Sequence, residues 1–213
     1  MDQFLQAQIL KADLTAIDTH FTETETGLSD MARILLLKQS FILVANFFDF
    51  EITIRKIYRD HPELNELYKE FKSECEFAKY LRNKFVGHLK QELVNKALEW
   101  NPEIRMLLDG MNDAKVACAV NSLLLETAIN TYVDSDQKHK IFSSETDLNY
   151  PSDNVRFLKF LTLIIRSSIS YLEKYTSIRQ LELQIELDKS KGIKGMLDLA
   201  GMAGKTEFEF IKK

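Results

Sequence analysis

Residues 34–50 read ILLLKQSFILVANFFDF, the most apolar stretch of the chain. Apolar side chains would cover nearly every side of a helix here, so the stretch predicts a helix surrounded by other helices, at the centre of a bundle. It is interrupted by Lys38, Gln39, Asn46 and Asp49. Charged side chains are costly inside a bilayer, and we therefore expect a buried core helix rather than a membrane span.

The composition indicates a helical protein with one main domain. The 213 residues include only three prolines and seven glycines, and 45% are hydrophobic. Such a composition favours helices over a turn-rich sandwich of strands. No linker rich in Pro, Gly or Ser divides the chain before residue 190. We predict a mainly α fold, with an antiparallel helical bundle over residues 1–178 and a small C-terminal appendage over residues 179–213.

Apolar spacing and capping residues predict the order of the helices. Ser29 is the expected N-cap of the central helix, Pro62 the start of the third, and Asp113 the start of a later long helix. The expected helices cover residues 2–20, 28–61, 62–82, 89–100, 103–110, 113–137 and 152–176. Residues 138–151 form a polar loop, for which a lid, a substrate contact and simple disorder are all open interpretations.

The C-terminal appendage has a different period. Leu181, Leu183, Ile185 and Leu187 alternate with polar residues, and so do two phenylalanines in the segment TEFEFIK (206–212). Strict alternation predicts two short strands, joined by a connection that holds four of the seven glycines. The alternative for this part of the chain is a continued, frayed helix. An isolated hairpin is only marginally stable, so the strands would need to pack on the bundle or on a partner.

Charge and cysteine content suggest a cytoplasmic protein. The N-terminus MDQFLQAQ has no basic region or long apolar run typical of a secretory signal. Cys75 and Cys118 lie in helical patterns and are most simply reduced thiols, although a disulfide between them stays open. The net charge of −4 argues against a general nucleic-acid coat. Residues 79–91, however, hold four positive side chains and no acidic one, which allows either a phosphate-binding patch or a solvated lysine face.

The segment of residues 80–90, YLRNKFVGHLK, is the most promising site for chemistry. Arg82 and His88 would lie about 240° apart around an unbroken helix and could not act together. We expect Gly87 to take the left-handed conformation that ends a helix and to swing His88 back toward Arg82. A histidine can move a proton near neutral pH, and an arginine can neutralise charge on a reacting phosphate.

This segment resembles the signature of the HEPN superfamily, in which an arginine, usually followed by a polar residue, is separated from a histidine by four to six residues. Here the arginine is Arg82, the polar residue is Asn83 and the histidine is His88. Arg55 and His61 have the same spacing, but a lysine replaces the amide there, and the proline that follows His61 suggests a helix start. The matched motif covers about a dozen positions, while an all-helical context extends over most of the chain.

The resemblance implies a metal-independent endoribonuclease that works as a homodimer with a composite active site and needs no cofactor. The 2′-hydroxyl of the RNA would attack the adjacent phosphate and leave a 2′,3′-cyclic phosphate and a 5′-hydroxyl. The resemblance implies catalytic roles for Arg82, Asn83 and His88, as transition-state stabiliser, orienting residue and proton-transfer residue. The lysines nearby, Lys79, Lys84 and Lys90, are candidate contacts for RNA phosphates. A toxin or anti-phage abortive-infection effector, restrained by an antitoxin or partner protein, would suit this activity.

Two alternatives come from other functional classes. Many HEPN-like domains are non-catalytic RNA-binding or assembly modules, and a fold does not settle function. A plain helical interaction protein could instead use the C-terminal appendage to bind its partner. No metal site is expected, because His20, His61, His88 and His139 are far apart in sequence and form no ligand cluster. Except for His88, we expect these histidines to be solvated.

Overall fold

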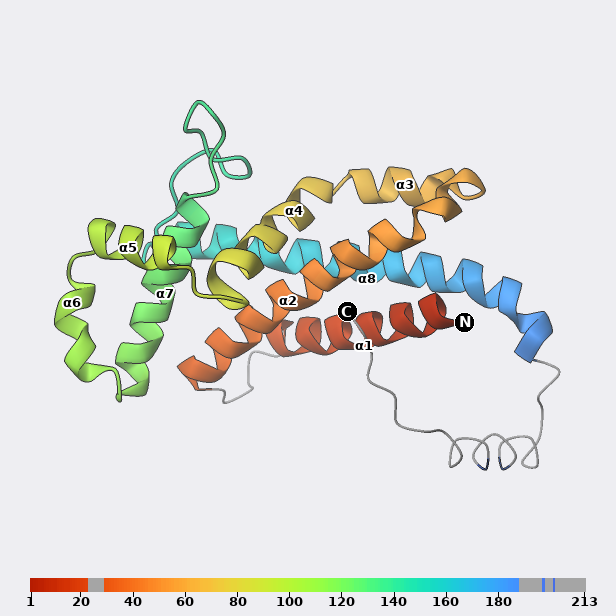
Figure 1. Cartoon of the computed structure of the whole chain (residues 1–213), viewed down its shortest axis with the longest axis horizontal. Coiled ribbons are helices and arrows are strands. Elements are labelled where there is room, and N and C mark those ends of the chain that lie inside the picture. Colours follow the sequence, from red (N-terminus) through yellow and green to blue (C-terminus); the bar gives the residue numbers. More distant parts are fainter. Residues whose placement is uncertain (23–28, 188–196, 198–200, 202–213) are drawn as a thin grey trace.

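A computed structural model describes residues 1–22, 29–187, 197 and 201 of the chain. The described part is mainly helical and forms a bundle (Figure 1). Its α-helices are α1 (Asp2–Thr22), α2 (Asp30–Ile54), α3 (Pro62–Lys69), α4 (Lys72–Leu81), α5 (Gln91–Trp100), α6 (Ile104–Leu107), α7 (Ala114–Asn130) and α8 (Pro151–Leu187). Two 3-10 turns, η1 (Arg55–Arg59) and η3 (Leu108–Gly110), and one π-helical turn, η2 (Arg82–Val86), lie between them.

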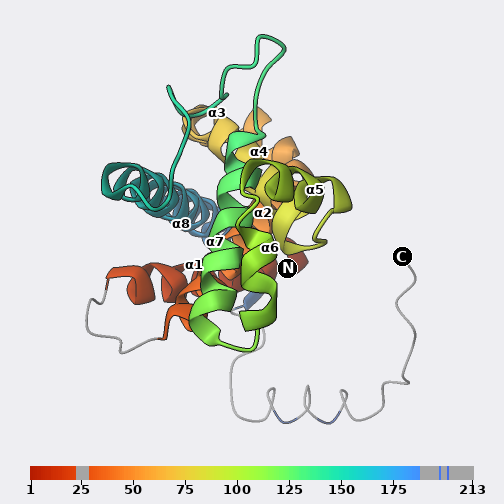
Figure 2. The same cartoon turned by 90° about the vertical axis from the view of Figure 1, so that its left-hand side faces the viewer.

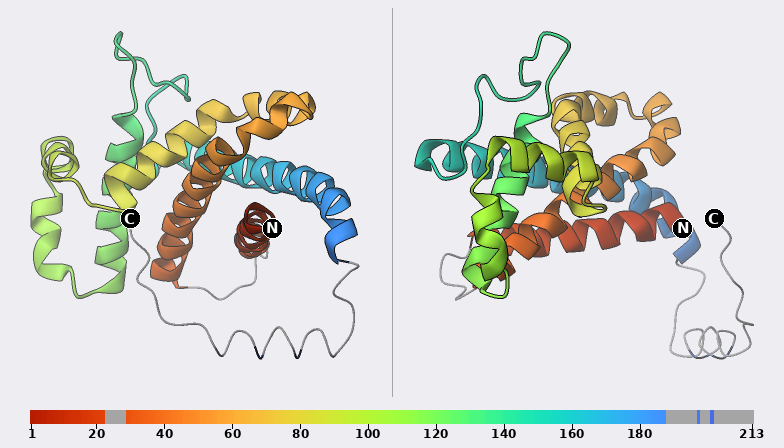
Figure 3. Two further views of the ribbon diagram at one scale, coloured as in Figure 1. Left: turned by 45° about the vertical axis from the view of Figure 1, so that its right-hand side comes forward. Right: turned by 60° about the vertical axis from the view of Figure 1, so that its left-hand side comes forward.

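Helix α2 is the centre of the bundle, as its apolar sequence predicts. It contacts α1, α4, α7 and α8, and the left view of Figure 3 looks almost along α1, which lies between α2 and α8. Phe47 of α2 packs against aromatic rings from other segments, with centroids 5.3 Å from Tyr171, 5.9 Å from Phe71 and 6.3 Å from Tyr68. Such offset and edge-to-face pairs stabilise the core beyond the effect of the apolar area that it buries.

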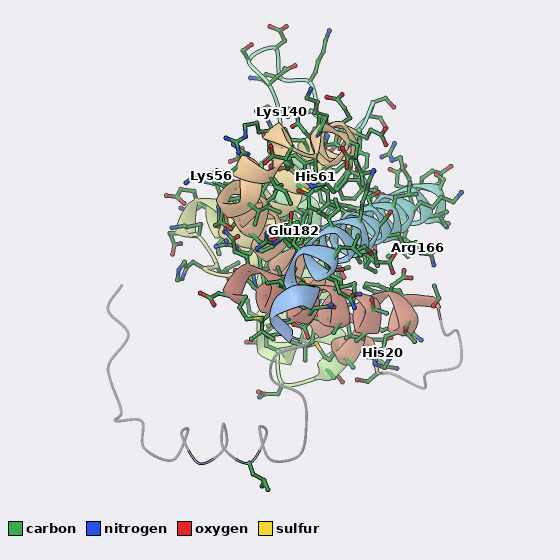
Figure 4. The ribbon with its side chains drawn as sticks, turned by 90° about the vertical axis from the view of Figure 1, so that its right-hand side faces the viewer. His20, Lys56, His61, Lys140, Arg166 and Glu182 are labelled. Atoms are coloured by element: carbon green, nitrogen blue, oxygen red, sulfur yellow. The ribbon has the colours of Figure 1, made fainter. Side chains whose placement is uncertain are left out.

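Helices α1 and α8 run alongside one another in opposite directions (Figure 1). The buried residues of α1 follow the helical period: Ala7, Leu10, Leu14 and Ile17. On the surface, Arg166 of α8, labelled in Figure 4, forms an ion pair with Asp18 of α1 at 2.9 Å. The antiparallel packing expected of a helical bundle is therefore present for this pair.

The predicted start of α2 is confirmed, and its predicted end is wrong. The side chain of Ser29 accepts a hydrogen bond from the backbone N–H of Ala32, as an N-cap should. The α-helix ends at Ile54 rather than at residue 61, and the chain tightens into the 3-10 turn η1, a common way for a helix to end. By length and composition, Asp30–Arg59 could also cross a membrane, although its side chains Phe41, Phe47 and Phe50 are buried in this fold.

The predicted third helix is divided into α3 and α4. Pro62 occupies the first turn of α3, as expected. The chain leaves the helical conformation at Phe71, whose φ of −136° turns it before α4 begins. Phe71 is buried against Phe47 and Tyr68, so the break directs a large side chain into the core. The predicted helix 113–137 is confirmed at its start only. Asp113 caps α7, but α7 ends at Asn130 and not at residue 137.

The first predicted strand of the appendage is wrong, because α8 continues through it to Leu187. Leu181 is 73% exposed and Leu183 only 6%, whereas a strand would place both on one face. The segment 179–187 consists of Arg, Gln, Leu and Glu with a single β-branched residue, and this high helix propensity overrides the alternation. The second predicted strand lies outside the described residues, and the division at residue 178 stays a prediction. Within the described part, the sole β pairing is an isolated bridge between Val133 and His139.

Candidate functional site

The segment that resembles the HEPN motif lies at the end of α4 and does not end as predicted. After Leu81 the chain forms the π-helical turn η2, in which the N–H of Gly87 donates to the carbonyl of Arg82 at 2.7 Å. The φ of Gly87 is −73°, so the expected left-handed glycine is wrong. A π turn inserts one extra residue into the helical ladder, and such turns are frequent at functional sites. It changes the direction in which the residues after Arg82 leave the helix.

Gly87 lies in close contact with Arg82, and its backbone conformation is one that any residue can adopt. A Cβ atom at this position would lie 3.3 Å from the carbonyl oxygen of Arg82 and 3.6 Å from its side-chain Cδ. The aliphatic part of Arg82 therefore runs past Gly87, the residue next to His88. The structure thus brings Arg82 beside the immediate neighbour of His88. In the described part of the chain, no hydrogen bond joins the two side chains directly.

The guanidinium of Arg82 is held by a residue of α2. Its Nη2 donates to Oδ2 of Asp49 at 3.1 Å, and Lys79 Nζ donates to Oδ1 of the same carboxylate at 2.6 Å. The Arg82 side chain is 29% exposed, and its Nε is buried with no hydrogen-bond partner among the described residues. One carboxylate thus holds two cations, and this small cluster keeps an excess positive charge.

His88 and Asn83 are exposed on the turn. Neither side chain is hydrogen-bonded to another residue in the described part of the structure. Within that part, no acidic residue fixes the orientation of the imidazole. A substrate or a second copy of the chain could supply the remaining contacts of a reactive histidine.

The three lysines predicted to contact RNA differ in their surroundings. Lys79 is engaged with Asp49 and also lies over the ring of Phe48, 4.5 Å from its centroid. Lys84 lies over the ring of Tyr80 at 6.0 Å. Lys90 is exposed, and it is the N-cap residue of α5. Lys84 and Lys90 are therefore better placed than Lys79 to meet a phosphate group.

Sequence reasoning missed the role of Asp49, which it treated only as a break in an apolar helix. A charged residue in such a helix needs a partner, and the basic segment 79–90 was the obvious source of one. A second charged residue of α2 also contacts the π turn. The Nζ of Lys38 lies 4.8 Å from the ring centroid of Phe85 and donates to Asn121 Oδ1, and partial burial lowers the pKa of Lys38.

His139 is not solvated, contrary to expectation. Its Nδ1 accepts the backbone N–H groups of Ile141 and Phe142 at 3.0 and 2.9 Å, and its Nε2 lies 2.9 Å from the carbonyl of Ile129. This pattern requires the neutral ring with the proton on Nε2. Burial lowers the pKa of His139, and the positive charge of Arg156 lowers it further. This histidine anchors the loop that follows α7.

The other candidate groups are accounted for by the fold. Cys75 and Cys118 are free thiols, and burial raises the pKa of both. Among the described residues, no group of three or more His, Cys, Asp or Glu side chains is arranged to hold a metal ion. His20 is exposed near the end of α1, and His61 lies 3.3 Å from Glu63 just before α3; Figure 4 labels both.

No family model, curated protein or solved structure matches this chain. The likeness to the HEPN superfamily therefore depends on the segment 80–90 and its helical surroundings.

Proposed function

We propose that this protein is a metal-independent endoribonuclease of the HEPN type. The observation that carries the proposal is the π turn after α4, in which Arg82 packs against Gly87 and is held by Asp49 while His88 stays exposed next to them. A fixed cation beside an accessible imidazole suits the cleavage of a phosphodiester. The helical bundle is compatible with this family, although many activities share one fold.

In the proposed reaction, His88 takes the proton of the RNA 2′-hydroxyl or delivers a proton to the leaving 5′-oxygen. The 2′-oxygen bonds to phosphorus as the bond to the 5′-oxygen breaks, which yields a cyclic phosphate and a 5′-hydroxyl. Arg82 has five N–H donors, and Asp49 takes one of them, so others can bind the charged phosphate oxygens. Asn83 would orient the phosphate, and Lys84 and Lys90 would bind the neighbouring backbone.

A homodimer would complete this site. The exposed His88 has no acidic partner among the described residues of its own chain, and proton transfer at both the attacking and the leaving oxygen is simplest with two histidines. In the composite site implied by the family resemblance, the second His88 comes from a second copy. Sedimentation or light scattering of the purified protein would test this part: a monomer at all assay concentrations would contradict it.

A second candidate function is a non-catalytic RNA-binding or assembly module. It is favoured by the ion pairs of Asp49, which engage both Lys79 and Arg82, and by the absence of an orienting contact to His88 in the described residues. Such a module would bind RNA in a salt-dependent way without cleaving it. A role as a toxin or abortive-infection effector, with its antitoxin, depends on the first function.

The deciding experiment is incubation with total tRNA and a structured RNA in EDTA, with analysis of the product ends. We expect the wild type to leave 2′,3′-cyclic phosphates, and His88→Ala to be folded but inactive. His20→Ala, which removes an exposed histidine of α1, is the matched control and should cleave normally. Equal cleavage by the wild type and His88→Ala would indicate a contaminating nuclease, and no cleavage by a folded dimer would favour the binding module.

A further inference from the structure

A pocket of about 800 Å³ lies between the C-terminal end of α5 and the segment after α7. Figure 2 looks onto α5, α6 and α7, with the segment 131–150 rising above them. Trp100 and Lys96 of α5 form one side of the pocket, and Gln137, Lys138 and Ser143 are on the other. Neither the proposed reaction nor the core uses these side chains.

The pocket combines an aromatic face with polar groups. Trp100 is 44% exposed, and the Nζ of Lys96 lies 5.2 Å from its ring centroid while pairing with Glu99 at 2.9 Å. Glu145 also lines the pocket, so its charge is mixed rather than strongly basic. Exposed aromatic rings with amide, hydroxyl and ammonium groups around them are typical of sites that stack and hydrogen-bond an unpaired base.

The segment that closes this pocket is firmly held. His139 accepts two backbone N–H groups of the segment, and Asn130 of α7 binds Thr146 through both the carbonyl and the N–H of its backbone, at 2.8 and 2.9 Å. Gln137 has a φ of 61°, the sole positive value of a non-glycine residue in the described ranges. Such a conformation costs energy and persists where the surroundings impose it, often at a binding site. The pocket is thus largely formed before a ligand arrives.

Helix α5 connects this pocket to the proposed catalytic turn. It begins directly after Lys90 and ends at Trp100, and its ten residues span about 15 Å, a length that a few nucleotides can bridge. Further aromatic–cation pairs lie where α4 meets η2 and in the segment 131–150. Lys84 lies over Tyr80, the rings of Tyr80 and Tyr132 are 4.8 Å apart, and Lys140 lies 5.0 Å over Tyr132.

We propose that this pocket binds an unpaired base of the RNA by stacking on Trp100, a few nucleotides from the bond that is cut. The inference rests on the proposed function in naming RNA as the ligand and in placing the bond that is cut at the π turn. It makes single-stranded segments and loops the preferred substrate class. Duplex RNA, whose bases are stacked and paired, cannot enter the pocket without opening.

The test uses the fact that the chain has a single tryptophan. A short single-stranded RNA with 2′-O-methyl groups, which cannot be cleaved by 2′-hydroxyl attack, is titrated against the full-length protein. We expect saturable quenching of the Trp100 fluorescence by this probe and little change with a duplex of the same sequence. By anisotropy of a labelled probe, Trp100→Ala should bind about 5- to 100-fold more weakly, and Trp100→Phe should recover most of the affinity.

Two controls separate this proposal from the ribonuclease activity. Met106→Ala, at an 84% exposed apolar position of α6, should bind like the wild type. His88→Ala should show full quenching without any cleavage of natural RNA. Quenching without cleavage by the wild type would support the pocket and refute the ribonuclease. If the wild type cleaves RNA without quenching and Trp100→Ala binds the probe equally well, the pocket proposal alone is refuted. If the wild type shows neither cleavage nor quenching, both proposals are refuted.

Discussion

Replacing Asp49 with alanine separates the positioning of Arg82 from the stability of the fold. The Asp49 carboxylate is the shared acceptor for Arg82 at 3.1 Å and Lys79 at 2.6 Å, and its side chain is 47% exposed. Alanine removes both acceptor oxygens without adding a group that could clash. We expect Arg82 to lose its fixed place beside Gly87, while the apolar contacts of α2 remain.

The expected loss of stability is small and the expected loss of activity is large. Partly exposed ion pairs are worth about 0–1 kcal/mol each, and alanine in a helix returns up to about 0.7 kcal/mol. The net effect is at most about 1–2 kcal/mol, which for a protein of this size lowers the melting temperature by only a few degrees. A catalytic group displaced by about 1 Å can cost about 100-fold in rate, and we expect Asp49→Ala to cleave about 10- to 100-fold more slowly.

The assay compares melting by circular dichroism with the rate of cleavage of labelled RNA in EDTA. Asp18→Ala is the matched control, because it also removes an acidic residue of a helix. Asp18 pairs with Arg166 at 2.9 Å, and both residues are far from the π turn in sequence. It should lose similar stability and no activity. A wild-type rate for Asp49→Ala would refute the positioning argument. A faster rate would also refute it, since Asp49 would then restrain Arg82 instead of placing it.

Three other substitutions or conditions test the site and the fold. Gly87→Ala should lower cleavage at least several-fold, because its Cβ would lie 3.3 Å from the carbonyl oxygen of Arg82. Gly201→Ala, at a position with no described atom within 4 Å of the added Cβ, should cleave normally, and a normal rate for both variants would contradict the packing argument. The pKa of His139 is lowered in the fold, so below about pH 6.5 the unfolded chain binds more protons than the folded chain. The free energy of unfolding, measured with urea, should therefore decrease from pH 7.5 to pH 5. His139→Gln should reduce this pH dependence, and an unchanged dependence in the variant would contradict the role given to His139. Glu51→Ala should cost about 1–3 kcal/mol in the same urea assay, because the partly buried Tyr58 would lose the acceptor of its O–H, whereas Arg55, 49% exposed, can turn to water. A loss below about 0.5 kcal/mol would show that Tyr58 finds another partner.

The sequence was sufficient for the starts of three helices, each of which carries a local signal. Ser29, Pro62 and Asp113 each mark a helix start that the structure confirms, because a cap acts through local hydrogen bonds. Helix ends set by tertiary packing were not predictable in the same way. The break at Phe71 depends on aromatic partners that are distant in sequence, and a local period cannot reveal them.

Two errors had the opposite cause, since a local pattern was given too much weight. The alternation of Leu181 and Leu183 suggested a strand, although the residues between and around them are good helix formers. Gly87 suggested a left-handed cap, because that is the commonest use of glycine at a helix end. In the structure, the lack of a side chain at Gly87 leaves room for Arg82. This contact between Gly87 and Arg82 can be recognised only when the path of the arginine side chain is known.

The apolar stretch 34–50 of α2 holds two charged residues, Lys38 and Asp49, and these could have located the site from the sequence. Lys38 and Asp49 are 11 residues apart, which is close to three turns of a helix, so both lie on nearly the same face. In an otherwise apolar helix, two charges on one face imply a partner with polar groups at both positions. The π turn is that partner: Phe85 lies under Lys38, and Arg82 pairs with Asp49. The central helix therefore holds the proposed catalytic turn at two points, and a rearrangement of α2 would have to move Arg82 with it.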